Sequence, residues 1–433
     1  MARDLGVQVA TIGKGADERR SRRESSGAAA AAQFAKVLGG MKGGATKIGQ
    51  MLSMIDLSAL PSAYREPLQS ELGSLLDSVP EVAFPQMRDQ IELGVQDSLE
   101  SVFAEFDTEP VGSASIGQVY RAVLADGRRV AVKVKYPGVD QAVESDIRNL
   151  VAFVKFWHRA LPIGGAKELV AEVADALRGE LDYEAEASNQ RRAAALYRGH
   201  PFVVVPDVVP EFCGSDILVT EWFDGSHFDE WHTLSQRERD RLGEIIFRFY
   251  VGGIYRNSEF CADPHPGNVL LGSDGRVGFV DYGAYKVMTP EEVAFEVGMW
   301  NAAARRDAAT LYGLVVEQGM VSDTDSIGPA ECLEYAVHAY GWQLGLGGGR
   351  VDGVDRAILS MFDPRNDAFD AFRRQNFPPA HLVSRRVDLF ATTMLRSLGA
   401  EANWSAIASE WLADGLPTTD LGRMEAEWLA ARE

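Results

Sequence analysis

The sequence predicts an α+β protein with two lobes, a β-rich lobe followed by a helical lobe, and a helical extension ahead of them. Residues 119–123 and 130–134 have the pattern of β-strands, and Ala125-Asp126-Gly127 between them is a strong hairpin signal. From about Ser235 onward the pattern is mainly helical. A helical pattern also precedes Phe103, where the period changes.

These changes of pattern divide the chain into segments. Leu60-Pro61 ends the first helical stretch, and a long helical insert is expected over roughly 139–196. Strands are expected again at 203–205 and 217–220, and a short hairpin over 269–280. The expected segments are a flexible N-terminus (1–25), a helical extension (26–102), a β-rich lobe with a helical insert (103–222) and a helical lobe (223–433).

The composition is ordinary for a soluble globular protein, with 46% apolar and 24% charged residues in a chain of 433. A formal net charge of −20 argues against a nucleic-acid partner, because phosphate binding normally leaves a basic footprint. The three cysteines lack CxxC spacing and so indicate neither a zinc site nor a disulfide framework. No stretch has the pattern of a signal peptide or a transmembrane helix, which predicts a cytoplasmic protein.

Four arginines between residues 19 and 23 lie beside an apolar, glycine-containing helical stretch. This arrangement is compatible with peripheral contact to an anionic membrane surface. A solvated, frayed chain end is the alternative interpretation.

The most informative motif lies in the helical lobe. Asp263 is followed five residues later by Asn268, and Asp281 follows the short hairpin. This is the spacing of a protein-kinase-like catalytic centre, in which one Asp faces the acceptor hydroxyl. An amide and a second carboxylate then hold Mg²⁺ against the phosphates of ATP, because hard oxygen ligands suit this ion. The sequence therefore predicts Asp263 as the catalytic base and Asn268 and Asp281 as the metal ligands.

Residues 111–119 overlay the glycine-rich loop of kinases, with Ala114 in place of the middle glycine. Small residues before a strand are common, so the loop alone is weak evidence for nucleotide binding. The stronger evidence is Lys133, which ends the strand Val-Ala-Val-Lys and could contact the α- and β-phosphates. Lys135, two residues further on, points to the same face of that strand. Only the motif therefore favours Lys133 as the phosphate-binding lysine. Glu221 and Phe223, after the strand at 217–220, are expected at an adenine-binding hinge. The expected nucleotide-binding residues are Gly112, Ser113, Ala114, Ser115, Gly117, Val119, Lys133, Glu221 and Phe223.

A buried lysine needs a counter-charge, and Glu186 is the expected partner of Lys133. Asp182, Glu186 and Asn189 fall at i, i+4 and i+7, which would place them on one helix face. A solvated acidic face is the alternative, since like charges at i, i+4 destabilise a helix slightly. The cations offered by Lys133 and Mg²⁺ favour the functional interpretation.

Two features depart from an ordinary protein kinase. His265 occupies the position of a phosphate-stabilising lysine, and no Ala-Pro-Glu anchor follows Asp281. Instead Thr289-Pro290-Glu291-Glu292 has the pattern of a helix N-terminus. The platform that binds peptides is expected to be absent, which makes a peptide substrate unlikely.

The motifs together resemble those of the UbiB/AarF/ADCK family of atypical kinase-like proteins, over roughly residues 30–400. Lys47-Ile48-Gly49-Gln50 is similar to the family's KxGQ segment, and Glu180-Leu181-Asp182 to its ExD motif. Residues 113–119 resemble its alanine-rich loop, and residues 262–268 match its catalytic loop closely. The resemblance implies a two-lobed kinase-like fold that binds ATP and Mg²⁺.

The resemblance also implies that the KxGQ helix covers the active site as a lid, with Lys47 and Gln50 near Glu180 and Asp182. Family members support the biosynthesis or handling of isoprenoid lipids such as ubiquinone, often at a membrane. The chain departs from the family pattern at Gly112-Ser113 in the loop and at Cys261, where a histidine is usual. It also lacks the C-terminal transmembrane pair of some bacterial relatives.

Three functions remain open on the sequence alone. The first is an atypical kinase or ATPase that supports ubiquinone, menaquinone or other isoprenoid-lipid metabolism. The second is a nucleotide-gated module that binds a lipid or a partner protein with little turnover. The third is phosphorylation of a small hydroxylated metabolite.

Overall fold

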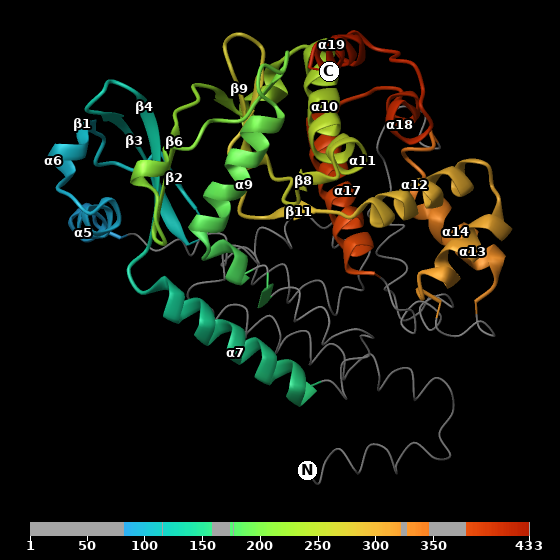
Figure 1. Cartoon of the computed structure of the whole chain (residues 1–433), viewed down its shortest axis with the longest axis horizontal. Helices are drawn as coiled ribbons and strands as arrows, with labels where there is room; N and C mark the ends of the chain where they lie inside the picture. Colours follow the sequence, from blue (N-terminus) through green and yellow to red (C-terminus); the bar gives the residue numbers. More distant parts are fainter. Residues whose placement is uncertain are drawn as a thin grey trace. The chain divides into compact units, whose positions relative to one another are not determined.

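The computed structural model describes residues 82–114, 116–157, 174–175, 177–321, 327–345 and 378–432. The chain divides into two units, residues 1–80 with 140–177 and residues 81–139 with 178–433. Helix α7 (Val139–Trp157) belongs to the first unit from residue 140 onward. The second unit holds the other described strands and helices (Figure 1). The expected flexible N-terminus and the KxGQ segment lie outside the described residues.

An antiparallel sheet with the strand order β1-β3-β4-β6 forms the β-rich lobe of the second unit, and β2 pairs with β3. In β4 the side chains alternate, so Val130, Val132 and Val134 are buried while Lys133 lies on the opposite face. Gly127 in the β3–β4 turn has φ +88°, which favours glycine. The expected hairpin is confirmed. The strands are β1 (Phe103–Phe106), β2 (Gly112–Ser113), β3 (Gly117–Leu124), β4 (Arg129–Lys135) and β6 (Ile217–Glu221).

Three helices accompany this sheet. Helix α5 (Phe84–Val95) contacts β4 and β6, and α6 (Leu99–Val102) leads directly into β1. Helix α9 (Tyr183–Leu196) contacts β6 and carries Glu186. In Figure 1 the sheet lies at the left of the second unit, with α9 in green beside it.

Two small sheets flank Asp263, Asn268 and Asp281 in the second lobe. The first has the strand order β5-β10-β9-β7, in which β9 and β10 form the expected hairpin. The second pairs β8 with β11 in antiparallel fashion. The strands are β5 (Val203–Val204), β7 (Ser226–His227), β8 (Glu259–Cys261), β9 (Val269–Leu271), β10 (Val277–Phe279) and β11 (Tyr285–Val287).

The remainder of the second lobe is helical, as expected. Thr289 caps α12 in the manner that its sequence predicts: its hydroxyl accepts from the Glu292 N–H at 3.2 Å, and Glu292 accepts from the Thr289 N–H at 2.8 Å. The helices are α10 (Gln236–Phe247), α11 (Gly253–Asn257), α12 (Pro290–Ala304), α13 (Ala308–Glu317), α14 (Pro329–Tyr340), α17 (Pro379–Leu398), α18 (Trp404–Leu412) and α19 (Asp420–Ala430).

Tryptophans contribute to the core of this lobe. Trp300, Trp342 and Trp404 are buried, and the ring of Phe247 contacts those of Trp342 and Trp404. Core packing is therefore the use of these rings. No helix in the described part of the chain has the length and apolar character to cross a membrane.

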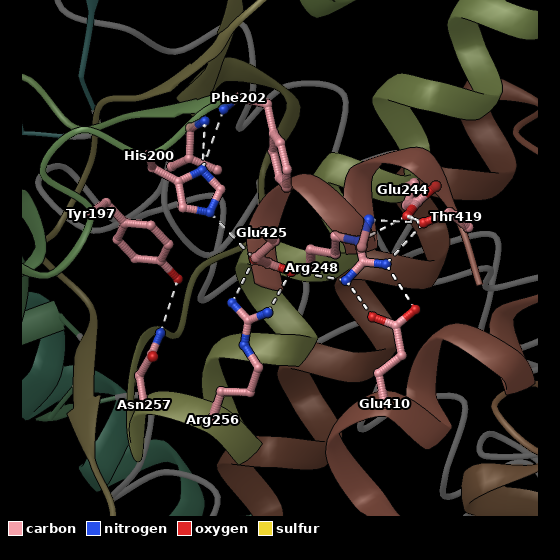
Figure 2. Close-up of polar contacts among 12 residues, drawn as sticks. Tyr197, His200, Phe202, Glu244, Arg248, Arg256, Asn257, Glu410, Thr419 and Glu425 are labelled. Carbon is pink, nitrogen blue, oxygen red and sulfur yellow. Dashed lines mark hydrogen bonds and ion pairs between the residues drawn. The ribbon is translucent and has the colours of Figure 1, made fainter. Parts of the chain in front are cut away.

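A buried ion cluster joins the C-terminal helices to the centre of the lobe (Figure 2). Arg248 begins the single π-helical turn η4 (Arg248–Gly252), and its side chain is 1% exposed. Its guanidinium donates to Glu244 at 2.8 Å, to Glu410 at 2.8 and 3.1 Å, to Glu425 at 2.8 Å and to Thr419 at 3.1 Å. All five N–H donors of the guanidinium are thereby used.

Glu425 on α19 is the second centre of this cluster. Arg256 forms an ion pair with it, and its Oε1 lies 3.3 Å from Nε2 of His200. Burial by itself would raise the pKa of Glu425, but the charges of Arg256 and Arg248 and the hydrogen bonds from His200 and Arg256 together outweigh it, and the pKa is lowered. Burial lowers the pKa of His200 despite the bond to Glu425, so this imidazole is neutral near pH 7.

Candidate nucleotide site

Lys133 on β4 faces two carboxylates that come from distant parts of the chain. Its Nζ lies 2.8 and 2.9 Å from the two carboxylate oxygens of Glu186 and 3.4 Å from Oδ2 of Asp281. Glu186 is 2% exposed, and the side chains of Lys133 and Asp281 are 15% and 23% exposed. The structure thus brings together three of the residues that the motifs indicated.

The choice between Lys133 and Lys135, which the sequence left to the motif, is decided by geometry. Lys135 lies two residues further along β4, and its Nζ forms an ion pair with Oδ1 of Asp216 at 3.2 Å. Lys133, by contrast, contacts both Glu186 and Asp281.

The charges of this group are coupled. Burial would lower the pKa of Lys133, but the carboxylates of Asp281 and Glu186 outweigh it, and the pKa is raised well above its usual range. Burial raises the pKa of Glu186 to about 7, against the opposing effect of Lys133. One ammonium therefore faces two carboxylates, an arrangement in which a further cation would be stabilised.

The β9–β10 hairpin places Asn268 next to the residue before Asp281, and the backbone of Asp263 is linked to Asn268. Asn268 directly precedes β9, and its carbonyl accepts from the Val280 N–H at 3.1 Å, one residue before Asp281. The Asn268 amide nitrogen donates to the carbonyl of Asp263 at 3.3 Å. This bond orients the amide so that its oxygen is the atom left to bind a cation.

Two hydrogen bonds hold the turn that contains Asp281. The Asp281 carboxylate accepts from the Gly283 N–H at 3.0 Å, and Cys261 donates its S–H to the Asp281 carbonyl at 3.3 Å. Cys261 is buried at the end of β8, where it pairs with Tyr285 of β11. The cysteine at this position thus still links the catalytic loop to Asp281.

His265, at the position where protein kinases have a phosphate-stabilising lysine, forms a hydrogen bond within its own loop. Its Nδ1 accepts from the Gly267 N–H at 3.0 Å, within its own loop. The ring stabilises the turn η5 (Pro266–Asn268) that presents Asn268.

The small-residue loop forms a hairpin between β2 and β3. Gly112 pairs with Val119 and Ser113 with Gln118, while the Ala114 N–H donates to the carbonyl of Gly117 at 2.8 Å. Ser115 lies outside the described residues. Val119 is the register partner of Lys133, so the end of the loop lies directly beside the lysine.

The two glycines of this hairpin differ in their surroundings. A Cβ on Gly117 would lie 2.2 Å from the carbonyl oxygen of Val134, whereas a Cβ on Gly112 would meet nothing within 4 Å. We expect Gly117→Ala to separate β3 from β4 and to lower the unfolding free energy by about 1–3 kcal/mol. Gly112→Ala, as the matched control, is expected to remain within about 0.5 kcal/mol of the parent. Urea denaturation measures both, and equal stability of the two variants would contradict the assignment.

The expected hinge lies at the end of β6. The N–H of Glu221 donates to Asp207 at 2.8 Å and that of Trp222 to Arg129 at 2.9 Å, so the sheet uses both groups. The ring of Phe223 packs against Gly278, where a Cβ would lie 2.5 Å from it. An adenine contact in this stretch would therefore use groups other than the N–H groups of Glu221 and Trp222.

Of the four expected lid residues, the structure describes Glu180 and Asp182. Asp182 is not on the face of α9 with Glu186, as the i, i+4 spacing suggested; it is the N-cap, and its carboxylate accepts from the Ala185 N–H at 2.8 Å. The helix begins one residue later than the pattern required. Glu180 approaches the site: its carboxylate lies 3.8 Å from the place of a Cβ on Gly283. Lys47 and Gln50 lie outside the described residues.

Sequence reasoning missed Tyr183, the first residue of α9. Its ring is fully buried, and Lys133 Nζ lies over it at 5.1 Å from the ring centroid. The only signal in the sequence was its place directly after the ExD motif.

The donor set fits Mg²⁺ rather than a softer ion. An amide oxygen of Asn268 and a carboxylate of Asp281 are hard ligands, and phosphate and water oxygens would complete the coordination. In the described part of the chain, no three His, Cys, Asp or Glu side chains are grouped so as to hold a metal without such help.

Comparisons with known proteins show the family to which the chain belongs. A family model described as the ABC1 atypical kinase-like domain matches residues 74–314. The chain is 29% identical over 327 residues to the chloroplastic protein Activity of BC1 Complex Kinase 1 of Arabidopsis thaliana, covering 73% of this chain and 46% of that protein. It is 29% identical over 288 residues to the mitochondrial atypical kinase COQ8 of Saccharomyces cerevisiae, covering 66% and 56%.

The chain spans about half the length of these two curated relatives. Among solved structures, the complex of Rv3197 with erythromycin from Mycobacterium tuberculosis is similar, with a TM-score of 0.63 and 27% identity. That match covers 92% of this chain and 98% of the other. The resemblance to UbiB, AarF and ADCK proteins is thereby confirmed, and the chain belongs to the ABC1 atypical kinase-like family.

Proposed function

We propose that this protein binds MgATP between Lys133 and the Asn268–Asp281 pair and turns it over slowly as an atypical kinase or ATPase. The observation that carries the proposal is the contact of Lys133 with both Glu186 and Asp281. A lysine held in this way by a helix glutamate and a metal-binding aspartate is the arrangement that positions phosphates in kinases.

Each residue has one task in this proposal. Lys133 holds the α- and β-phosphates, and Glu186 keeps the ammonium in place. Asn268 and Asp281 hold Mg²⁺, which neutralises charge on the phosphates when it is bound. Asp263 accepts the proton of the attacking hydroxyl or water. The hairpin of residues 112–119 covers the phosphates with its backbone N–H groups.

The acceptor is water or a small or lipid hydroxyl rather than a peptide. Only residues 282–288 separate Asp281 from Thr289, the N-cap of α12. Residues 285–287 form β11, and the Met288 N–H donates to the Ser258 carbonyl at 2.7 Å. This stretch is already used in the fold, which removes the segment on which kinases bind peptides. A lid containing Lys47 and Gln50, facing Glu180 and Asp182, would restrict access further.

The similarity to mitochondrial and chloroplastic members of the family supports a role in ubiquinone, menaquinone or other isoprenoid-lipid metabolism. A cytoplasmic location with peripheral membrane contact fits such a role. A nucleotide-gated module that binds a lipid or partner protein is the alternative. The solved relative carries erythromycin, so a macrolide belongs among the ligands to be tried.

Phosphate release decides between enzyme and module. We expect slow release by the parent protein that rises with liposomes or with phenolic quinone-precursor mimics. In Asp263→Asn the rate should fall by at least about 100-fold, because the base is lost. MgATP affinity should stay within about threefold, since Asp263 is not a metal ligand in this scheme. Nucleotide binding without phosphate release in the parent protein would favour the module.

A further inference from the structure

Tyr183 lies beneath both lysines of β4. Lys133 and Lys135 point to the same face of the strand, and their Nζ atoms lie 5.1 and 5.5 Å from the centroid of the Tyr183 ring. The tyrosine is 0% exposed, so the contacts are shielded from water. A cation over the face of an aromatic ring is attracted by the negative charge of that face, and more strongly when water is excluded.

Each ammonium has its carboxylate partner in addition to the ring. Lys133 contacts Glu186 and Asp281, and Lys135 contacts Asp216. The carboxylates fix how far each ammonium extends, while the same aromatic ring lies within cation–π distance of both. Removal of the ring would leave the Lys133 ammonium held only from the carboxylate side.

The hydroxyl of Tyr183 takes no part in these contacts. It has no hydrogen-bond partner among the described residues, although it is buried. It lies beside the nucleotide hairpin, where a Cβ on Gly117 would be 3.0 Å from it. Burial raises the pKa of this phenol, so it stays neutral. The ring and not the hydroxyl is therefore the part of the side chain that acts on Lys133.

We propose that Tyr183 is a positioning residue whose aromatic face holds the Lys133 ammonium at the place where it meets the phosphates. The part of this proposal that concerns phosphate binding rests on the proposed function. The contact between ring and ammonium stands independently of it. Phenylalanine should then replace tyrosine without loss, and an aliphatic residue should not.

The first measurement uses no nucleotide. The parent protein, Tyr183→Phe and Tyr183→Leu are treated with an amine-reactive reagent over a range of pH, and labelling of Lys133 and Lys135 is followed by mass spectrometry. We expect Lys133 to be labelled about tenfold faster in Tyr183→Leu than in the parent protein. Without the ring, the protonated ammonium is less stabilised, and the reactive neutral amine is more populated. Tyr183→Phe is expected to match the parent protein. Half-buried Lys286 on β11, away from the Tyr183 ring contacts, serves as an internal reference within each sample.

The second measurement is MgATP binding by the same three proteins. We expect Tyr183→Leu to bind about tenfold more weakly and Tyr183→Phe to bind like the parent protein. If the parent protein fails to bind MgATP, the proposed function is wrong, while the labelling result still decides the contact.

Two outcomes would overturn the inference. Equal labelling of Lys133 in all three proteins would mean that Tyr183 only fills space in the core. If Tyr183→Phe behaves like Tyr183→Leu, the effect belongs to the hydroxyl and not to the ring. If Tyr183→Leu does not fold, trifluorophenylalanine at position 183 replaces it, since fluorine weakens the negative ring face at nearly constant shape. Labelling at Lys133 must then exceed that of the Phe variant, and equality would again refute the contact.

Discussion

Asp281→Asn is expected to weaken magnesium-dependent ATP binding at least about 100-fold, or about 2.7 kcal/mol. The substitution keeps the size of the side chain and can keep the bond from the Gly283 N–H at 3.0 Å. It removes the charge that faces Lys133 at 3.4 Å and that would bind Mg²⁺. Titration calorimetry with ATP, in the presence of Mg²⁺ and then of excess chelator, measures the effect.

The β9–β10 turn offers a matched control for this experiment. Asp274 is an exposed carboxylate that pairs with Arg276 at 2.7 Å, on the hairpin that leads to Asp281. Asp274→Asn should therefore leave MgATP affinity unchanged. Affinity that is also unchanged in Asp281→Asn would refute the metal assignment.

The second large effect is expected in stability. Arg248→Met should lower the unfolding free energy by about 3–5 kcal/mol, because it leaves buried carboxylates without their common cation. Glu244, Glu410 and Glu425 all face this guanidinium, and their side chains are at most 9% exposed. Urea denaturation followed by circular dichroism measures the loss.

Arg423→Met is the control for the Arg248 variant. Arg423 lies on α19 and pairs with Asp420, but its side chain is 55% exposed. An exposed pair contributes little, so this variant should stay within about 0.5 kcal/mol of the parent protein. If Arg248→Met changes the unfolding free energy by a similarly small amount, the prediction is wrong. The desolvation penalty of the buried charges would then be about as large as the stabilisation from their pairing.

Local pattern predicted much of the fold and several of the residues that the structure brings together around Lys133. The β3–β4 and β9–β10 hairpins follow from turn residues that need a particular backbone, as Gly127 and Gly275 do with positive φ. The cap at Thr289 follows from side chains within four residues of each other. Lys133 and Asp281, which the structure brings into contact, were indicated by motif spacing that is typical of phosphoryl transfer, and the roles of Asp263 and Asn268 stay predictions.

What the sequence could not supply depends on contacts between distant residues. Lys133 and Lys135 are equivalent in period, and only the places of Glu186 and Asp216 distinguish them. Asp182 has the spacing of a helical residue, yet it ends outside the helix because its side chain satisfies a free N–H of the first turn. The partners of Arg248 extend to Glu425, beyond any local pattern.

The pairing of β8 with β11 has a consequence for how such a protein is controlled. Strand β8, before Asp263, pairs with β11, after Asp281, and α12 begins shortly after β11. Residues 285–288 are thus already paired within the fold, and they do not form the extended loop that phosphorylation reorganises in many kinases. Under the proposed function, control of turnover would have to come from access to the site rather than from this stretch.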